Sequence, residues 1–382
     1  MGNQLNGKKF LWKNSHQVND REVQFMSITN WSDSLAEHLQ NYENVLLVLS
    51  KGGSNRGYYS KIQDNFESKS VSVIEDVPTL PDLDYVEKLF NDFKGIKFDC
   101  IVGIGGGSVI DITKALKVII NMSSHAKFNK DFFDGEIDLD LSTPDLIAIP
   151  TTAGTGSEVT SFSTLWDKSV LRKKSIHHSK LKPDFVIYDE NLLKSLSYQN
   201  LLFPAFDAIS HAFDSLWNIN LTKESKELAL NSIKLSTQAF ENLAQPPKQN
   251  SYDSETYKNL LQASSLAGMA INLTRTSLSH SISYPLTSHF NIPHGLACIF
   301  TVPTIFSFVK SSLDLSNGEI VELDFLLKIL KNFDLSSVIK PYFNELDVFS
   351  LLPEMKSNRS ENFFMNVDQL LITKILDKSL NT

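Results

Sequence analysis

The pattern of apolar and polar residues changes half-way along the chain. In the first half, short runs of branched apolar residues, such as 44–49 (NVLLVL) and 98–104 (FDCIVGI), alternate with amphipathic segments. Continuous runs of this kind are typical of parallel strands that are buried on both faces. Beyond residue 190 the apolar positions recur with the period of a helix instead. The pattern therefore predicts an α/β domain over residues 1–190 and an all-α domain over residues 191–382.

The first half predicts a doubly wound sheet, because strands alternate with helices along it. Its expected strands are 44–49, 71–75, 98–104, 145–150 and 183–189, with edge strands within 9–30 and a hairpin formed by 162–166 and 175–178. Its expected helices are 82–93 and 108–121, and a loop is expected at 50–54. In the second half we expect helices at 198–219, 222–243, 253–271, 274–287 and 295–311, then shorter helices that end with an amphipathic one near 367–375.

Two polar loops follow strands of the expected sheet. The first, 105–108 (GGGS), leads straight into a helix, where glycines let the backbone approach a pyrophosphate and the positive helix end meets its charge. This loop lacks the third glycine of G-x-G-x-x-G, and such glycines also serve only to let a helix pack closely. The second loop, 151–158 (TTAGTGSE), lies where open α/β sheets bind ligands. Hydroxyl-bearing residues and glycines are also common in ordinary turns.

One aspartate and three histidines form a candidate metal site in the second half. Asp207 and His211 are four residues apart, which places both on one face of a helix. His280 and His294 lie in apolar surroundings, where a neutral imidazole usually needs a partner for both ring nitrogens. A carboxylate with three imidazoles suits a divalent ion such as iron or zinc. Each of these residues, taken alone, is more often an ordinary buried histidine or a helix cap, and only the combination favours a metal site.

Composition limits the classes of partner. The chain is 42% apolar and 21% charged, with a mean hydropathy of -0.13, as expected of a globular protein outside the membrane. Its net charge of -8 argues against nucleic acid or an anionic membrane as a partner. No signal-like apolar run is present, so we expect a cytoplasmic protein. Cys100 and Cys298 lie in apolar runs and are expected to be packed thiols.

Two segments carry a resemblance to a known family. Residues 207–217 (DAISHAFDSLW) and 279–303 (SHSISYPLTSHFNIPHGLACIFTVP) resemble the metal-binding half of the iron-containing alcohol dehydrogenases, and within that family the phosphonoacetaldehyde reductases. Residues 150–158 resemble the same family's PTTAGTGSE loop. The resemblance implies Fe²⁺, or Zn²⁺, on the second domain and NADH or NADPH on the first. The cofactor-binding residues that it implies are Gly105, Gly106, Gly107, Ser108, Asp111, Thr151, Thr152, Thr155 and Lys173.

Three positions bear on the details of the chemistry. Tyr284 stands where the family usually has a histidine that helps proton transfer, and we expect it either to donate the proton or to serve only in helix packing. Ser50 stands where the family often has a carboxylate that discriminates against NADP, so both nicotinamide cofactors are expected. A phosphonate group needs a cationic partner. Arg275, five residues before His280, is the first candidate, although it can also be an ordinary solvated charge.

We therefore expect an enzyme that reduces a small aldehyde to a primary alcohol, with phosphonoacetaldehyde to 2-hydroxyethylphosphonate as the favoured reaction. The first alternative is a general short-chain alcohol dehydrogenase. A dehydroquinate synthase-like lyase is less favoured, because those enzymes have a Glu/His/His ligand set, and a non-catalytic relative is disfavoured by the intact ligands. The expected partner is a small molecule, with no nucleic acid and no membrane, and the expected assembly is a homodimer or larger homo-oligomer.

Overall fold

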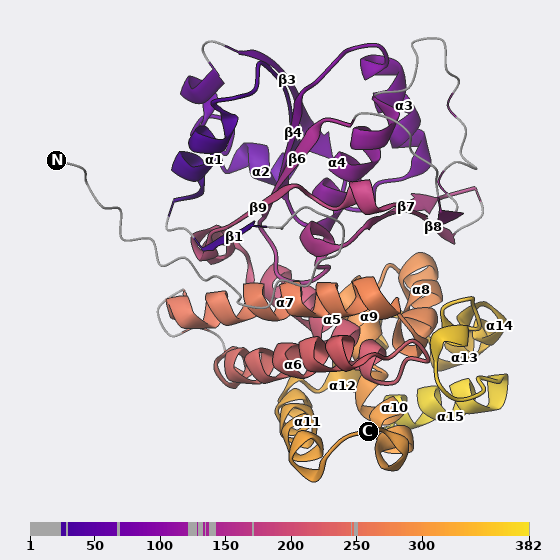
Figure 1. The fold of residues 1–382 in the computed structure, drawn as a ribbon. Helices are drawn as coiled ribbons and strands as arrows, with labels where there is room; N and C mark the ends of the chain where they lie inside the picture. The colour runs from indigo at the N-terminus through magenta and orange to yellow at the C-terminus, as the bar shows by residue number, and fades with distance from the viewer. Residues whose placement is uncertain are drawn as a thin grey trace. The chain divides into compact units, whose positions relative to one another are not determined.

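The chain folds into two compact units (Figure 1). The first unit comprises Met1–Thr151 and Ser157–Leu192, and the second comprises Thr152–Gly156 and Leu193–Thr382. The computed structural model describes residues 24–27, 30–66, 69–120, 128, 133, 135–136, 143–169, 172–245, 247 and 251–381. The boundary between the units lies two residues beyond the predicted one, and five residues of the polar loop 151–158 belong to the helical unit.

The first unit is built on a six-stranded parallel sheet with the strand order β1-β9-β6-β4-β2-β3. Its strands are β1 (Gln24–Ser27), β2 (Asn44–Ser50), β3 (Ser70–Val77), β4 (Cys100–Gly105), β6 (Asp145–Pro150) and β9 (Phe185–Tyr188). β4 is buried along its whole length, as its continuous apolar run predicted. Gly105 pairs with Pro150, so the loops that follow β4 and β6 leave the same edge of the sheet. The α/β fold class predicted for this part of the chain is confirmed.

Helices and a small second sheet complete the first unit. The helices are α1 (Trp31–Leu39), α2 (Lys51–Asn55), α3 (Leu83–Phe93) and α4 (Gly107–Ile119), and the small sheet contains β5 (Gly135–Glu136), β7 (Phe162–Asp167) and β8 (Arg172–His177). β7 and β8 are antiparallel, which confirms the predicted hairpin. The prediction of a loop at 50–54 is wrong. Residues 51–55 form the short helix α2, and Ser50 caps it by accepting a hydrogen bond from Gly53 N at 3.1 Å. The other edge strands expected within 9–30 fall outside the described residues.

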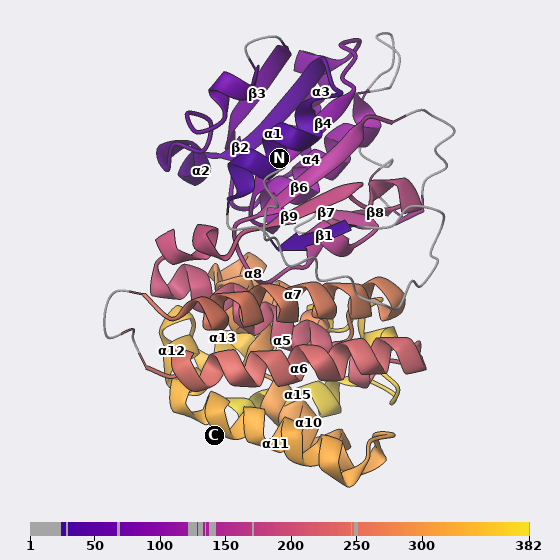
Figure 2. The same cartoon turned by 60° about the vertical axis from the view of Figure 1, so that its left-hand side comes forward.

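The second unit is helical, as predicted. Its helices are α5 (Tyr198–Leu216), α6 (Lys223–Leu243), α7 (Ser254–Thr274), α8 (Leu278–Phe290), α9 (His294–Ile299), α10 (Val302–Val309), α11 (Asn317–Leu330), α12 (Leu335–Ile339), α13 (Glu345–Ser350), α14 (Leu352–Met355) and α15 (Gln369–Leu380). The two long helices α6 and α7 lie side by side, and α5 packs against both (Figures 1 and 2).

Two predicted helices are interrupted. The helix expected at 274–287 does not begin until Leu278, because the chain turns at Arg275, which has a φ of 69°. The helix expected at 295–311 is divided into α9 and α10. Pro303 lies in the first turn of α10, where its missing N–H costs nothing, but it cannot continue the hydrogen bonding of the preceding helix. Both breaks lie beside the candidate site.

Glycines explain why part of the polar loop belongs to the helical unit. A Cβ at Gly154 would lie 2.6 Å from the carbonyl oxygen of Pro204 in α5. A Cβ at Gly156 would lie 2.5 Å from the Cα of Gly268 in α7, and Gly156 has a φ of 61°. Only glycine allows the loop backbone to lie this close to both helices.

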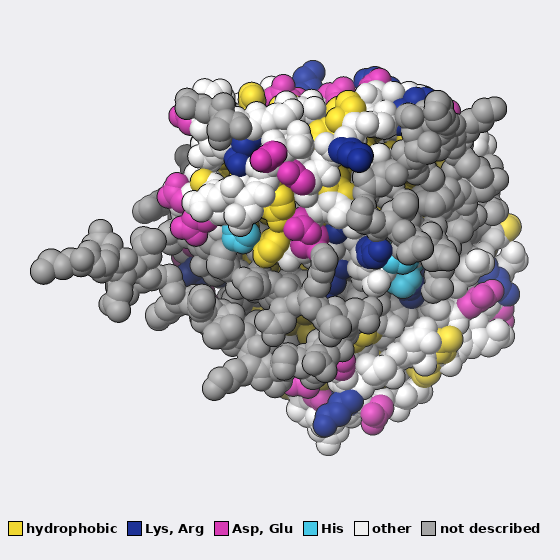
Figure 3. Space-filling model, turned by 45° about the horizontal axis from the view of Figure 1, so that its top comes forward, with side chains coloured by type: hydrophobic (Ala, Val, Ile, Leu, Met, Phe, Trp, Pro, Cys, Tyr) yellow, Lys and Arg dark blue, Asp and Glu magenta, His cyan; other side chains and the backbone are white. Residues whose placement is uncertain are grey.

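Charged side chains of both signs are interspersed over the described part of the face shown in Figure 3. The apolar segment His294–Ser312 is long enough to cross a membrane, but 67% of it is buried within the structure. A core helix of a globular protein has the same length and composition.

Gly295 brings α9 against α5. A Cβ at this position would lie 1.8 Å from the carbonyl oxygen of Phe203, so Gly295→Ala should separate the two helices. We expect this overpacking to lower the free energy of unfolding by about 3 kcal/mol. Gly318→Ala is the matched control, because Gly318 has open space around it, and there alanine should be neutral or stabilise α11 by up to about 1 kcal/mol. Urea unfolding measures both, and equal stability of the two variants would contradict a close contact between α5 and α9.

Candidate metal centre

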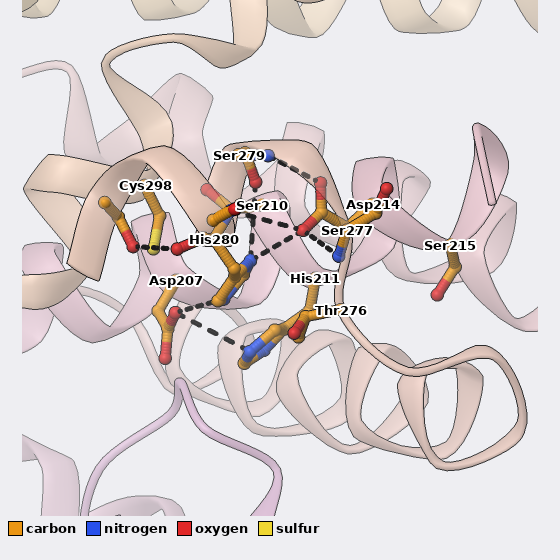
Figure 4. Close-up of polar contacts among 12 residues, drawn as sticks. Asp207, Ser210, His211, Asp214, Ser215, Thr276, Ser277, Ser279, His280 and Cys298 are labelled. Atoms are coloured by element: carbon orange, nitrogen blue, oxygen red, sulfur yellow. Dashed lines mark hydrogen bonds and ion pairs between the residues drawn. The ribbon is translucent and has the colours of Figure 1, made fainter. Parts of the chain in front are cut away.

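Three helices of the second unit bring the four predicted ligands together. Asp207 and His211 come from α5, His280 comes from α8, and His294 is the first residue of α9. Oδ1 of Asp207 lies 3.3 Å from Nε2 of His280, 3.7 Å from Nε2 of His211 and 3.8 Å from Nε2 of His294. The rings of His211 and His280 are stacked, with 4.5 Å between their centroids. Three imidazole nitrogens therefore surround one carboxylate oxygen (Figure 4 shows Asp207, His211 and His280).

A second carboxylate, Asp214, fixes the orientation of His280. Its Oδ2 lies 2.8 Å from Nδ1 of His280 and accepts a hydrogen bond from Ser277 N at 2.7 Å (Figure 4). Its Oδ1 accepts from Trp217 Nε1 at 2.8 Å and from Ser279 N at 3.2 Å. A proton on Nδ1 leaves Nε2 of His280 free to bind a metal, and a carboxylate behind a ligating imidazole also raises its basicity.

Sequence reasoning missed Asp214, although its spacing was a signal. Residues 207, 211 and 214 lie at i, i+4 and i+7, which is one face of α5. Asp214 also explains the break at Arg275. The amides of Ser277 and Ser279 can reach its carboxylate only if the chain leaves α7 and turns before α8 begins.

The protonation states fit a divalent cation. Burial raises the pKa of Asp207, but His211, His280 and His294 lower it further, so the net pKa is below the usual value and the carboxyl is ionised. Burial lowers the pKa of His211 to about 4, so this imidazole is neutral at pH 7. Burial also opposes the ionisation of Asp214, but its hydrogen bonds to His280, Ser277 and Ser279 hold its pKa below the usual value. Burial opposes the protonation of His280, but Cys298, Asp207 and Asp214 outweigh it and hold its pKa well above the usual value, so this ring can carry one compensating charge. A divalent cation would compensate both buried carboxylates, and the donor set suits iron or zinc.

Cys298 lies at the edge of this cluster. Its Sγ is 3.8 Å from both ring nitrogens of His294, one helical turn earlier in the chain, and Asp207, His280, His294 and Cys298 offer ligand atoms within 4.8 Å of one another. Burial raises the pKa of the Cys298 thiol. Because a thiol binds a metal as the thiolate, this shift favours the neutral side chain that the sequence predicted.

The two residues predicted to act on the substrate lie in different settings. The ring of Tyr284 stacks on that of His294, with 5.5 Å between centroids and 14° between the planes, so it borders the cluster. Its role in proton transfer stays a prediction. Arg275 does not precede His280 on a helix, as the prediction assumed, but lies in the link between α7 and α8. Its carbonyl accepts a hydrogen bond from Asn218 Nδ2 at 3.1 Å.

Most predicted cofactor residues lie at the carboxyl edge of the parallel sheet. Gly105 ends β4, and its carbonyl accepts a hydrogen bond from Thr151 N at 2.9 Å. Gly106 is the N-cap of the 13-residue helix α4, and it has no side chain that could accept a hydrogen bond from the first-turn N–H groups. Gly105 is also required for close contact, because a Cβ there would lie 2.4 Å from Val109 Cγ2.

Other predicted cofactor residues serve the fold or lie elsewhere. Ser108 Oγ donates to the carbonyl of Thr79, and Asp111 Oδ1 accepts from Ser157 Oγ at 2.6 Å. Lys173 lies on β8 in the small sheet, with Nζ 5.2 Å from the centre of the Trp166 ring. Thr152 and Thr155 belong to the second unit. The residues predicted to bind the dinucleotide are therefore divided between the two units.

Comparisons with known proteins place the chain in a family. Residues 27–190 match the family "Iron-containing alcohol dehydrogenase", and residues 204–329 match "Fe-containing alcohol dehydrogenase family, C-terminal". The chain is 30% identical over 280 residues to phosphonoacetaldehyde reductase of Streptomyces viridochromogenes, which covers 72% of this chain and 69% of that protein. This chain belongs to the iron-containing alcohol dehydrogenase family. The predicted family, fold class and enzymatic nature are confirmed.

Other relatives have similar sequence identities to this chain. Sulfoacetaldehyde reductase of Bilophila wadsworthia is 33% identical over 60% of this chain and 57% of that protein. 4-Hydroxybutyrate dehydrogenase of Clostridium kluyveri is 26% identical over 72% of each. The iron-containing alcohol dehydrogenase of Thermotoga maritima has the same fold, with a TM-score of 0.76, 25% identity, and coverage of 95% of this chain and 99% of that one. This enzyme family uses iron or another divalent metal with NAD(H).

The arrangement suits carbonyl reduction. When bound, a divalent metal would act as a Lewis acid on a carbonyl or alcohol oxygen. A nicotinamide would exchange hydride with the carbon atom that bears this oxygen. Asp207, His211, His280 and His294 would hold the metal, and Asp214 would keep the His280 lone pair directed toward it. Tyr284 borders His294 on the more exposed side of the cluster, since the His294 side chain is 23% exposed and that of His280 1%.

Asp214→Asn tests the support behind the metal site. The carboxylate of Asp214 accepts hydrogen bonds from N–H groups, and the NH₂ group of asparagine would face some of these donors instead. The preferred tautomer of His280 would then be lost. We expect the affinity for Zn²⁺, measured by competition with a chelator, to fall about ten- to a hundredfold.

Ser215→Ala is the matched control, because it removes a neighbouring buried hydrogen bond, between Ser215 and Thr274, that does not reach the cluster. Its metal affinity should equal that of the wild type. Unchanged affinity in Asp214→Asn, with the helical content intact, would show that the His280 contact does not support metal binding.

Proposed function

We propose that this enzyme reduces small aldehydes bearing an anionic group at the far end, with phosphonoacetaldehyde as the first candidate, to the primary alcohols. One observation carries the proposal. Three of its relatives are named for substrates of this kind, and the terminal group is a phosphonate in one, a sulfonate in another and a carboxylate in the third. The shared feature is a short chain with a reacting carbon at one end and a negative charge at the other.

In this proposal the metal is held by Asp207, His211, His280 and His294, and iron is the first candidate because of the family. The reducing cofactor binds at the carboxyl edge of the parallel sheet. Ser50 ends β2 at that edge and carries no charge, so it would not repel the 2′-phosphate of NADPH. We therefore include NADPH beside NADH. The general alcohol dehydrogenase reading is the competing outcome of the substrate test.

The substrate test compares short aldehydes of different charge, and tert-butylacetaldehyde has the shape of phosphonoacetaldehyde without its charge. Phosphonoacetaldehyde, sulfoacetaldehyde and succinic semialdehyde form the charged set, and tert-butylacetaldehyde and butanal form the neutral set. With iron-loaded enzyme and NADH or NADPH, we expect kcat/KM for the best charged aldehyde to exceed that for the neutral ones by about tenfold or more, which is the worth of a hydrogen bond to a charged group. Efficient turnover of butanal with no gain for the charged set would favour a general alcohol dehydrogenase.

Ser50→Asp tests the cofactor site. Aspartate caps a helix as well as serine does, so α2 should form as before while a negative charge is added at the end of β2. We expect kcat/KM with NADPH to fall about tenfold relative to NADH, because the new charge repels the 2′-phosphate alone. Ser50→Asn keeps the cap without the charge and should leave the ratio unchanged. An unaltered ratio in Ser50→Asp would place the adenosine ribose elsewhere.

A further inference from the structure

We infer that Arg359, which the sequence did not single out, holds the anionic end of the substrate. The inference rests on the proposed function and names the residue that would recognise the charge. Arg359 lies just before the short turn Ser360–Asn362, 65 residues after His294, the last predicted ligand, by the numbering of the sequence. Its guanidinium carbon is 4.5 Å from the centre of the Tyr284 ring.

Tyr284 links this arginine to the metal cluster. The same tyrosine ring stacks on His294, and it lies one turn after His280 on α8. A guanidinium over an aromatic ring can still donate N–H groups to a phosphonate, sulfonate or carboxylate, which it can bind through two hydrogen bonds. His294 and Arg359 therefore both contact the ring of Tyr284, with the His294 ring centre at 5.5 Å and the Arg359 guanidinium carbon at 4.5 Å from its centre.

The position of Arg359 is fixed by α8 itself. Ser281 Oγ donates to the carbonyl of Met355 at 2.6 Å and lies 2.7 Å from Ser357 Oγ. Ser357 Oγ in turn accepts a hydrogen bond from the backbone N of Arg359 at 3.3 Å. Ser281 and Tyr284 are three residues apart, so they share a face of the helix. The turn that carries Arg359 is therefore attached to the face of α8 that carries Tyr284.

Arg359 has no counter-ion among the described residues. No described carboxylate forms a salt bridge with its guanidinium, although the residue is only partly exposed. Lys226 and Lys310 in the same unit do pair with aspartates. The guanidinium of Arg359 is therefore available to pair with an anionic ligand. Arg275, in contrast, lies in the link between α7 and α8, so the helical spacing that favoured it does not exist.

Arg359→Gln should separate charged from neutral substrates. We expect KM for phosphonoacetaldehyde to rise about ten- to a hundredfold, the loss of a hydrogen-bonded charge, with kcat changed by less than about threefold. KM for tert-butylacetaldehyde, which has the same shape without the charge, should change by less than about threefold. Arg359→Lys keeps the charge without the planar fork and should give an intermediate rise.

Lys356→Gln is the matched control, because it removes an exposed positive charge three residues away in the same turn and should alter neither KM. Binding of ethylphosphonate to the purified protein, measured by calorimetry, gives a readout without turnover and should weaken in Arg359→Gln alone. Equal effects of Arg359→Gln on charged and neutral aldehydes, or none on either, would overturn this inference while leaving the proposed function intact. A wild-type enzyme that does not prefer charged aldehydes would overturn both.

Discussion

The second unit depends on the burial of Asp207 among three imidazoles. An ionised carboxylate removed from water costs several kcal/mol unless a cation or hydrogen-bond donors compensate it. Here Nε2 atoms from three helices approach the same oxygen, and a second buried carboxylate, Asp214, stands behind His280. In the absence of metal His280 can supply one positive charge, because the lowering of its pKa by burial is outweighed by Cys298, Asp207 and Asp214, which hold this pKa well above the usual value, whereas His211 is neutral at pH 7. A divalent cation compensates both carboxylates at once, and it is the simplest reason for this cluster to exist.

The helices around the cluster are shaped by that requirement. Gly295 lets α9 approach the backbone of α5, which brings His294 beside Asp207. The turn at Arg275 directs the amides of Ser277 and Ser279 toward Asp214. The loop residues Gly154 and Gly156 lie against α5 and α7, so part of the polar loop follows the helical unit rather than the sheet that precedes it. The turn at Arg275 and the close approaches at the glycines are thus explained by the contacts that the residues of the site make there.

These same contacts mark what the sequence could and could not predict. Continuous apolar runs were enough to predict β2, β4 and β6, because a strand that is buried on both faces has apolar residues at nearly every position. The spacing of Asp207 and His211 predicted two side chains on one face, and the further i+7 position would have added Asp214. The break at Arg275 was not predicted, because apolar periodicity continues through a turn that is stabilised by hydrogen bonds to the distant carboxylate of Asp214. The break at Phe300 was also missed, although Pro303 was a signal for it. Arg359 had no signal of its own, since only the fold brings its turn to Tyr284.

X-ray absorption spectroscopy of the metal-loaded protein tests the central claim most directly, because it identifies the atoms bound to the ion. Cys298 lies beside His294, so the spectrum has two clearly different outcomes. Three imidazoles and a carboxylate give only nitrogen and oxygen scatterers, at about 2.0–2.2 Å for zinc. We expect that result, with imidazole multiple scattering that weakens in His280→Ala. A sulfur scatterer at about 2.3 Å, or a spectrum without imidazole, would contradict the assignment of Asp207, His211, His280 and His294 as the metal site.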